Sequence, residues 1–150
     1  MKLHLGSDHA GFTLKEHLRS WLTAQGHEVL DHGTTSGDRV DYPDFAARVA
    51  RAVQASGEER GILVCGSGIG VSMTANRFPG VRAVVAVLEI QARLARAHND
   101  ANVLCLGGRI TTPEHAEVLV DAFLSAPFEG GRHGPRVEKI DGVAVGEPNP

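Results

Sequence analysis

Cysteines and long apolar runs are both scarce in this sequence. It contains two cysteines, Cys65 and Cys105, too few for a disulfide framework or for a zinc site with four thiolate ligands. No apolar run is long enough for a secretory signal or a membrane-spanning helix. We therefore expect a cytoplasmic protein with reduced thiols and no membrane partner.

Charge of one sign is not in excess either. The 15 Lys and Arg residues stand against 18 Asp and Glu residues, which gives a net charge of −3. This balance excludes a generally basic surface for nucleic acid, although it allows a local cluster of arginines. We therefore expect no nucleic-acid partner.

Aromatic side chains are few, with five phenylalanines, one tryptophan and one tyrosine, whereas histidine occurs eight times. This surplus of histidine hints at chemistry near neutral pH, because the imidazole titrates there. The chain length of 150 residues predicts one domain with a real core, since a domain of about this size buries roughly 68–70% of its unfolded surface.

Short apolar runs alternate with amphipathic segments along the chain, which is typical of β/α units on a parallel sheet. We expect strands at residues 2–6, 28–30, 61–65, 81–87 and 103–106. We expect helices at residues 13–25, 43–57, 71–76 and 90–98 and from residue 113 onward. The predicted fold class is therefore α/β and Rossmann-like, with a parallel sheet in a three-layer α/β/α sandwich.

The composition changes after Pro127. Residues 128–136 contain three glycines, one proline and two arginines, which is not the composition of a core element. We assign residues 1–140 to a single domain and predict a loose C-terminal tail at residues 141–150.

Polar and reactive side chains follow several of the expected strands. In open parallel α/β sheets, ligands bind beyond the carboxyl ends of the strands. We therefore expect one site at this edge of the sheet, formed by residues 7–11, 65–70, 98–100 and 107–109.

The strongest of these segments is Cys65 with the glycine loop that follows it, Gly66-Ser67-Gly68-Ile69-Gly70. A thiol at a strand end that faces a helix N-terminus is activated as a thiolate, and glycines let several backbone N–H groups point at one anion. A core cysteine before an ordinary tight turn is the alternative. The three alternate glycines and the Ser67 hydroxyl favour a functional loop.

The glycine loop matches none of the common glycine-rich motifs. A dinucleotide fingerprint has the spacing G-x-G-x-x-G, and a phosphate-binding P-loop requires G-K-[ST]. A hydrolase nucleophile elbow requires G-x-S-x-G, but Cys65 stands two residues before Ser67.

Two further pairs of residues each have a structural and a functional interpretation. Asp8 and His9 can form an Asx turn that leads into a helix, or they can contact a ligand. His98 can stabilise the end of a helix dipole, with Asn99 as its cap, or it can act as an acid and base.

Three arginines, Arg109, Arg132 and Arg136, are candidates for an anion site. They can be solvated surface charges, but guanidinium groups beside glycine-rich backbone suit a phosphate group.

Eight motifs occur in a fixed order over roughly residues 1–140. They are Ser7-Asp8-His9-Ala10-Gly11, Asp41-Tyr42-Pro43-Asp44, Cys65-Gly66-Ser67-Gly68-Ile69-Gly70, Ala75-Asn76-Arg77, Pro79-Gly80-Val81-Arg82-Ala83, His98-Asn99-Asp100-Ala101-Asn102, Gly107-Gly108-Arg109 and Gly130-Gly131-Arg132-His133. Together they resemble the B-type ribose-5-phosphate isomerases of the wider ribose/galactose phosphate isomerase family.

This resemblance implies a five-stranded parallel sheet with strand order 2-1-3-5-4. It implies a homodimer or a dimer of dimers, with active sites between subunits. The implied reaction is the reversible interconversion of ribose 5-phosphate and ribulose 5-phosphate, with no metal and no organic cofactor.

The resemblance also implies a role for each candidate residue. Cys65 is the base that moves the proton, and the N–H groups of Gly66, Ser67, Gly68, Ile69 and Gly70 form an oxyanion hole. His98 opens the sugar ring. Ser67 and Asp8 contact sugar hydroxyls or the ring oxygen, and Asn99 binds the sugar or the enediolate. The phosphate is held by Arg132, Arg136, Arg109 and His9.

Two departures from the family pattern bear on these roles. Relatives without the cysteine use a glutamate just after the glycine loop, but Val71 stands there, and Ser67 replaces a common threonine. The intact His98-Asn99-Asp100 run favours a pentose phosphate over galactose 6-phosphate. Allose 6-phosphate, a tetrose phosphate and a non-catalytic phosphate- or nucleotide-binding module remain open alternatives.

Overall fold

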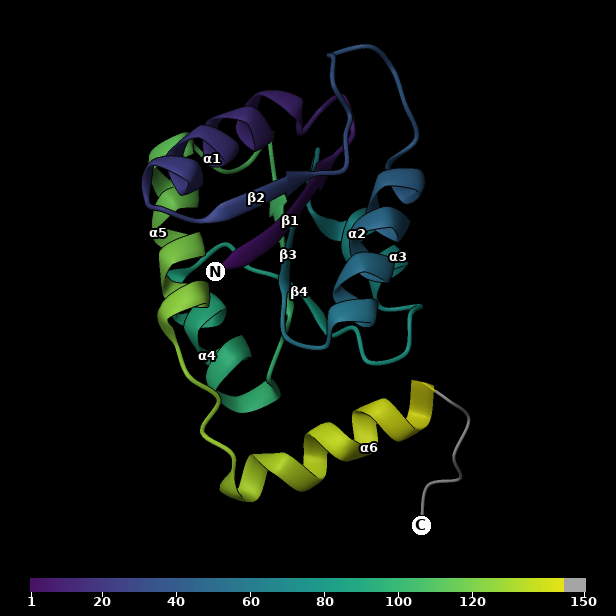
Figure 1. Ribbon diagram of the computed structural model, residues 1–150, viewed down its shortest axis with the longest axis vertical. Coiled ribbons are helices and arrows are strands. Elements are labelled where there is room, and N and C mark those ends of the chain that lie inside the picture. Colours follow the sequence, from purple (N-terminus) through teal and green to yellow (C-terminus); the bar gives the residue numbers. More distant parts are fainter. Residues whose placement is uncertain (145–150) are drawn as a thin grey trace.

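The computed structural model describes residues 1–144 as a five-stranded parallel sheet between helices (Figure 1). The strands are β1 (Lys2–Ser7), β2 (Glu28–Asp31), β3 (Arg60–Cys65), β4 (Ala83–Val85) and β5 (Val103–Gly107). The helices are α1 (Phe12–Ala24), α2 (Tyr42–Ser56), α3 (Ile69–Ala75), α4 (Glu89–Asn99), α5 (Pro113–Ser125), α6 (Gly134–Ala144) and the 3-10 helix η1 (Gly131–His133). None of these helices is long and apolar enough to cross a membrane.

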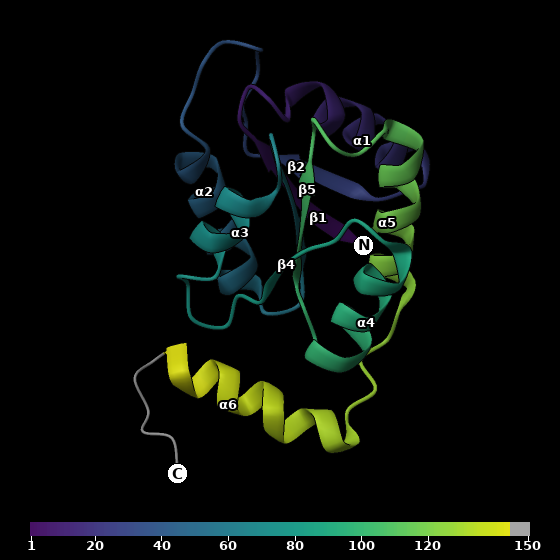
Figure 2. The ribbon, with the colours of Figure 1, turned by 180° about the vertical axis from the view of Figure 1, so that it is seen from behind.

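The strand order is β2-β1-β3-β5-β4, and each neighbouring pair is parallel. The predicted fold class and strand order are therefore confirmed. Helices α1, α4 and α5 cover one face of the sheet, and α2 and α3 cover the other (Figures 1 and 2).

Two apolar clusters, one on each face, hold the sheet between its helices. Leu18, Leu119 and Phe123 are fully buried in the first cluster, and Val49 and Leu63 are fully buried in the second. Each such side chain contributes about 1.5–3 kcal/mol of transfer free energy. Burial on both faces fixes the three central strands, and with them the positions of their carboxyl ends.

Strand β4 lies at the edge of the sheet and is shorter than the apolar run at residues 81–87 predicts. Its last pair with β5 joins Val85 to Cys105. Beyond this point the N–H groups of Val87 and Leu88 donate to Oε1 of Gln91, at 3.0 and 3.2 Å. The chain leaves the sheet here because these amides cap the start of α4 instead of extending the strand ladder.

Helix α6 is the main correction to the sequence prediction. The loose tail expected from residue 141 is wrong for residues 141–144, which are helical, and the rest of that tail lies outside the described residues. Pro135 suits the first turn of a helix, because its missing N–H would have no partner there. Val137 is buried, and Asp141 pairs with Arg82 at 3.0 Å, so α6 is attached to the body of the protein near the start of β4.

Candidate active site

Three neighbouring strands of the sheet end side by side and bring the first group of predicted residues together. Ser7 of β1 pairs with Val64 of β3, and Cys65 pairs with Gly107 of β5. Asp8, the glycine loop and Arg109 follow directly from these strand ends. We call this end of the sheet, where the parallel strands reach their carboxyl termini, the carboxyl edge.

Cys65 lies at the last position of β3 and is only 4% exposed. The N–H of Gly68 donates to its Sγ at 3.2 Å, and its carbonyl oxygen accepts the N–H of Gly108 at 2.7 Å. The sulfur is therefore fixed in place and faces a backbone donor. Cys105 differs, because it is fully buried among apolar side chains and burial raises the pKa of its thiol.

The glycine loop turns sharply and packs closely against its neighbours. Gly68 has φ of +80°, and a Cβ there would lie 3.0 Å from the carbonyl carbon of Leu106. A Cβ on Gly70 would lie 2.6 Å from Cζ of Tyr42, whose ring therefore rests on the loop. Glycine is needed at both positions, in the first case for conformation and in both for space.

Two of the five amides assigned to an oxyanion hole already have partners within the loop. The N–H of Gly68 donates to Cys65, and the N–H of Ile69 donates to Oγ of Ser67 at 3.3 Å. The number of amides that can serve an oxyanion hole is therefore smaller than the sequence predicts. The amides of Gly66, Ser67 and Gly70 remain the candidate donors to a bound oxyanion.

Arg109 lies against the glycine loop, as a phosphate or sugar contact requires. The backbone N–H of Arg109 donates to the carbonyl oxygen of Gly66 at 3.2 Å. Nη1 of its side chain lies 3.2 Å from the position that a Cβ on Gly66 would take. Its side chain is exposed, so the guanidinium group is available to a ligand at this edge.

Asp8 and His9 complete the carboxyl edge. Oδ1 of the buried Asp8 accepts the N–H of Gly11 at 3.0 Å, a bond three residues along the chain and therefore one residue longer than an Asx turn. Nδ1 of His9 lies 3.3 Å from the carbonyl oxygen of Val40, and a surface hollow lined by His9, Arg39, Val40 and Asp41 opens beside it.

The second group of predicted residues lies at the opposite edge of the sheet, which we call the amino edge. Helix α4 runs back from the end of β4 to the start of β5, so His98 and Asn99 at its end lie beside the strand beginnings. The expectation that residues 98–100 share an edge with Cys65 is wrong. The sheet separates the two groups by roughly 15 Å, because a strand rises about 3.3 Å per residue.

Arg132 and Arg136 lie at the amino edge with His98. Arg132 belongs to η1 and Arg136 to α6. Helix α6 lies at the bottom of the molecule in both views (Figures 1 and 2). Both side chains are exposed. The structure therefore divides the predicted residues, with Cys65 at one edge and His98, Arg132 and Arg136 at the other.

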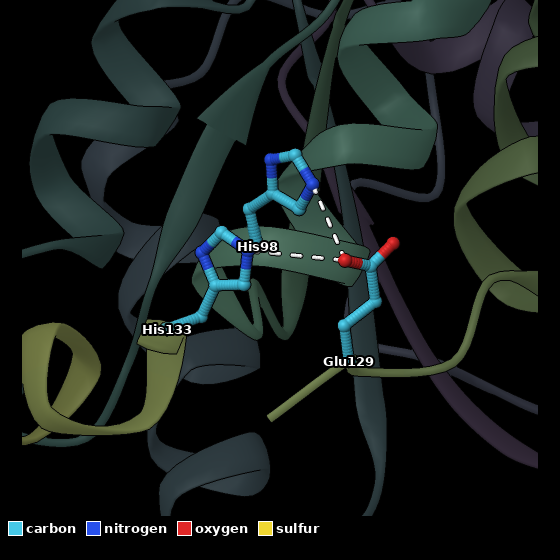
Figure 3. Close-up of side chains that lie close together, drawn as sticks. All are labelled: His98, Glu129 and His133. Atoms are coloured by element: carbon cyan, nitrogen blue, oxygen red, sulfur yellow. Dashed lines mark ion pairs between the residues drawn. The ribbon is translucent and has the colours of Figure 1, made fainter. Parts of the chain in front are cut away.

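Figure 3 shows a compact cluster around His98 that the sequence did not predict. The rings of His98 and His133 stack with centroids 4.2 Å apart and planes 7° from parallel. Oε2 of Glu129 lies 3.6 Å from Nε2 of His98 and 3.8 Å from Nε2 of His133. Burial, followed by the charges of His98 and Arg132, lowers the pKa of His133.

The atoms of this cluster are close enough together to invite comparison with a metal site, since all three possible ligand atoms lie within 4.8 Å. The orientation of the rings argues against chelation. A metal ion lies in the plane of each imidazole that binds it, and two stacked, nearly parallel planes share no such point.

Comparison with known proteins shows the family to which this chain belongs. A family model described as Ribose/Galactose Isomerase matches residues 3–140. The chain belongs to this isomerase family. The predicted enzyme class, an aldose–ketose isomerase, is confirmed at this level.

The relatives within the family are similar over nearly their whole length. Ribose-5-phosphate isomerase B of Escherichia coli (strain K12) is 48% identical over 142 residues, which cover 95% of each chain. D-erythrulose-4-phosphate isomerase of Pectobacterium atrosepticum is 38% identical, with 93% of each chain covered.

Solved structures from the family superpose closely. Ribose-5-phosphate isomerase B of Mycoplasma genitalium with bound ribulose-5-phosphate has a TM-score of 0.94 at 44% identity, with 97% of each chain covered. The Clostridium thermocellum enzyme has a TM-score of 0.95 at 46% identity and covers 97% of this chain and 98% of its own.

Three residues at these edges were missed as individual candidates. Tyr42 was part of a recognised motif, and the glycine at position 70 that accommodates its ring was the available signal. Glu129 and His133 flank the Gly130-Gly131 pair, and acidic and imidazole groups on either side of a double-glycine turn were the signal there.

Proposed function

We propose that this protein interconverts ribose 5-phosphate and ribulose 5-phosphate through an enediolate, with Cys65 as the base and without a metal or organic cofactor. The observation that carries the proposal is the Cys65 sulfur, fixed at a strand end with the N–H of Gly68 directed at it. Similarity to ribose-5-phosphate isomerases B over nearly the whole chain supports the same substrate.

The reaction moves one proton between neighbouring carbons. In the open-chain aldose, the Cys65 thiolate takes the proton from C2, and the negative charge spreads onto O1 as the enediolate forms. Protonation at C1, with transfer of the O2 proton to O1, gives the ketose. Each free amide of the glycine loop directed at the enediolate oxygen stabilises the transition state by about 2.7–4 kcal/mol.

The separation of the two edges supports a site shared between two copies of the chain. Cys65, Asp8 and Arg109 of one copy would meet His98, Asn99 and the arginines of another, as expected for a homodimer or a dimer of dimers. Exposed apolar side chains that a second copy could cover support this arrangement, among them Ile69 and Met73 of α3 and Ile140 and Val143 of α6.

The phosphate group would bind among four cationic or polar side chains from both edges. Arg109 and His9 lie at the carboxyl edge, and the exposed Arg132 and Arg136 would come from the second copy. Guanidinium groups bind phosphate with two parallel hydrogen bonds, which favours arginine over lysine for this role. The cytoplasm remains the proposed compartment, in keeping with two free cysteines.

Replacement of the proposed base tests this function. Cys65→Ala should reduce kcat for ribose 5-phosphate about 100- to 10,000-fold, the range expected for loss of an acid–base group. Cys105→Ala is the matched control, because it removes a fully buried thiol whose pKa is raised by burial and to which no role is assigned, and it should retain most of kcat. Near-normal turnover by Cys65→Ala would contradict the assignment of Cys65 as the base. Loss of wild-type activity in EDTA would contradict a metal-free reaction.

A tetrose phosphate is the second candidate substrate, because one relative is a D-erythrulose-4-phosphate isomerase. Membership in an isomerase family sets aside the non-catalytic binding module. We expect kcat/KM to be highest for ribose 5-phosphate in parallel assays with allose 6-phosphate, galactose 6-phosphate and erythrose 4-phosphate. A higher value for any of the other three would change the substrate but leave the role of Cys65 in place.

A further inference from the structure

The ring of His98 is held on two sides by groups to which no role is assigned. The imidazole of His133 covers one face of the ring, and the carboxylate of Glu129 faces its Nε2 atom (Figure 3). His98 itself is partly exposed, whereas His133 is buried. The ring of His98 is therefore accessible from solvent, with the buried His133 beneath it and the exposed carboxylate of Glu129 beside it.

The backbone of residues 129–133 brings this support to the end of α4. The N–H of Glu129 donates to the carbonyl oxygen of Ala97 at 2.9 Å, so its main chain is bound one residue away from His98. Gly130 and Gly131 both have positive φ, +61° and +52°, with open space where a Cβ would be. The turn they form returns the chain, and the N–H of His133 donates to the carbonyl oxygen of Gly130 at 2.9 Å.

The charges around the stacked pair favour a neutral His133. Burial and the neighbouring charges of His98, Arg132 and Arg136 lower its pKa, and only Glu129 opposes them. Nε of Arg132 lies 3.5 Å from Nε2 of His133, which fits an unprotonated nitrogen there. A neutral ring can stack under His98 in both protonation states of His98 without repelling it.

Glu129 lies where it can act on the proton of His98. At 3.6 Å its carboxylate is an ion-pair partner of Nε2 and is too far for a hydrogen bond, and such contacts tighten when substrate binds. A carboxylate here favours the tautomer with hydrogen on Nε2 and stabilises the imidazolium whenever His98 carries an extra proton. This is the role that a buried aspartate plays beside the histidine of a serine protease.

We propose that Glu129 and His133 are positioning residues that prepare His98 for sugar ring opening, an inference that rests on the proposed function. In that step O1–H of the furanose loses its proton, C1=O1 forms as the C1–O4 bond breaks, and O4 gains a proton. His98 carries the proton between the two oxygens and ends unchanged. Stacking on His133 fixes the plane of the ring, and Glu129 fixes its protonated nitrogen.

Ring opening can be measured apart from isomerisation in a Cys65→Ala background. Exchange between the α and β anomers of ribose 5-phosphate, followed by NMR exchange spectroscopy, reports opening and closing of the ring. We expect Cys65→Ala to accelerate this exchange over buffer, and the added change Glu129→Gln to remove at least about tenfold of the acceleration. Glu129→Asp should restore part of it, because the negative charge returns.

The outcomes of this experiment separate the two proposals. Full acceleration in the Cys65→Ala, Glu129→Gln protein overturns the role of Glu129. No acceleration in Cys65→Ala alone overturns ring opening by His98, and the inference with it. Continued isomerisation in Cys65→Ala contradicts the proposed base, while the effect of Glu129→Gln on anomer exchange remains measurable.

A pair of substitutions at residue 133 tests the stacking role. His133→Ala should lower kcat about tenfold with a change in KM of less than about twofold, because it frees the catalytic ring without removing a substrate contact. His133→Phe keeps a flat ring beneath His98 and should retain most of the activity that His133→Ala loses. Equal activity of the two variants, with both folded by thermal unfolding, overturns this part of the proposal.

Discussion

The carboxyl edge and the amino edge of the sheet are held together by different kinds of contact. At the carboxyl edge most of these contacts are main-chain hydrogen bonds. The N–H of Gly68 and the N–H of Gly108 fix Cys65 between β1 and β5. At the amino edge, side chains on a helix end and a glycine turn contact one another, and several are exposed. In the proposed function, each copy presents a fixed proton-transfer group at the carboxyl edge, and its amino edge presents exposed side chains to the sugar and the phosphate.

Among substitutions that keep the proposed base, the largest expected effect comes from the backbone of the carboxyl edge. Gly68→Ala would force a side chain into a left-handed conformation and against the Leu106 carbonyl carbon, which displaces the amide that donates to Cys65. We predict a loss of kcat of at least about 100-fold, because the sulfur loses its backbone donor and the neighbouring amides of the loop are displaced with it. Steady-state kinetics with ribose 5-phosphate measures this loss.

Gly131→Ala is the matched control at the amino edge. Its φ is also positive, +52°, but no atom lies within 4 Å of the added Cβ. The expected cost is conformational, about 1–2 kcal/mol of stability, with kcat within about threefold of wild type because no close contact is disturbed. A larger loss of kcat here than in Gly68→Ala would reverse the proposed contrast between the edges.

Substrate binding should depend on the arginines of the amino edge. Arg132→Ala removes an exposed guanidinium group and should raise KM for ribose 5-phosphate about 10- to 100-fold, the value of one or two charge-assisted hydrogen bonds. The unfolding midpoint should stay nearly constant. Arg51→Ala, on the outer surface of α2, is the control and should leave KM unchanged; equal changes in both would indicate a general loss of positive charge.

Stability should depend more on the support of the carboxyl edge. Lys15 is fully buried and pairs with Asp31, whose Oδ1 accepts the N–H of Gly33, and the carbonyl of Gly33 accepts the N–H of Ser7. Lys15→Met keeps the volume but removes the cation that pairs with Asp31 and with Oε1 of Glu16. Because Asp31 is partly exposed, we predict a loss of about 1–3 kcal/mol by denaturant unfolding.

An exposed ion pair on the same helix is the control for Lys15. Arg19→Met breaks a 2.6 Å contact with Glu16 at the surface and should leave the unfolding midpoint almost unchanged, since exposed pairs contribute little. If Arg19→Met destabilised the protein as much as Lys15→Met, the importance assigned to the buried pair would be wrong.

The smallest predicted effect is a pH dependence shared by both edges. Burial is the main cause of the lowered pKa of His32, near the carboxyl edge, and of His133, at the amino edge. The unfolded chain then binds protons more readily than the folded protein, so stability falls as the pH drops below about 6.5. Thermal unfolding from pH 7 to pH 5 should show a decline that His32→Gln makes shallower; an unchanged slope would contradict it.

The sequence was sufficient to predict the parallel sheet, its order and the cluster of Cys65, Asp8 and Arg109. The sheet and this cluster follow from the apolar strands and from the rule that parallel strands end at one edge, whereas the strand order follows from the resemblance to the isomerase family. It misplaced His98, because residues 98–100 were counted with that edge although a helix between parallel strands must return to the other. It missed α6 and the support of His98, since a segment with Gly130, Gly131 and Pro135 lacks the periodicity that marks a helix.

Complementation between two inactive variants tests most directly whether the active site is shared between copies. Cys65→Ala lacks the proposed base, and His98→Ala lacks the ring-opening group of the opposite edge. When the two proteins are mixed, unfolded and refolded together, half of the dimers are mixed, and one of the two sites in each mixed dimer is intact. We predict recovery of about a quarter of wild-type activity, as expected for symmetric two-fold sites. No recovery, with mixed dimers demonstrated by mass spectrometry, would contradict a site built from two copies.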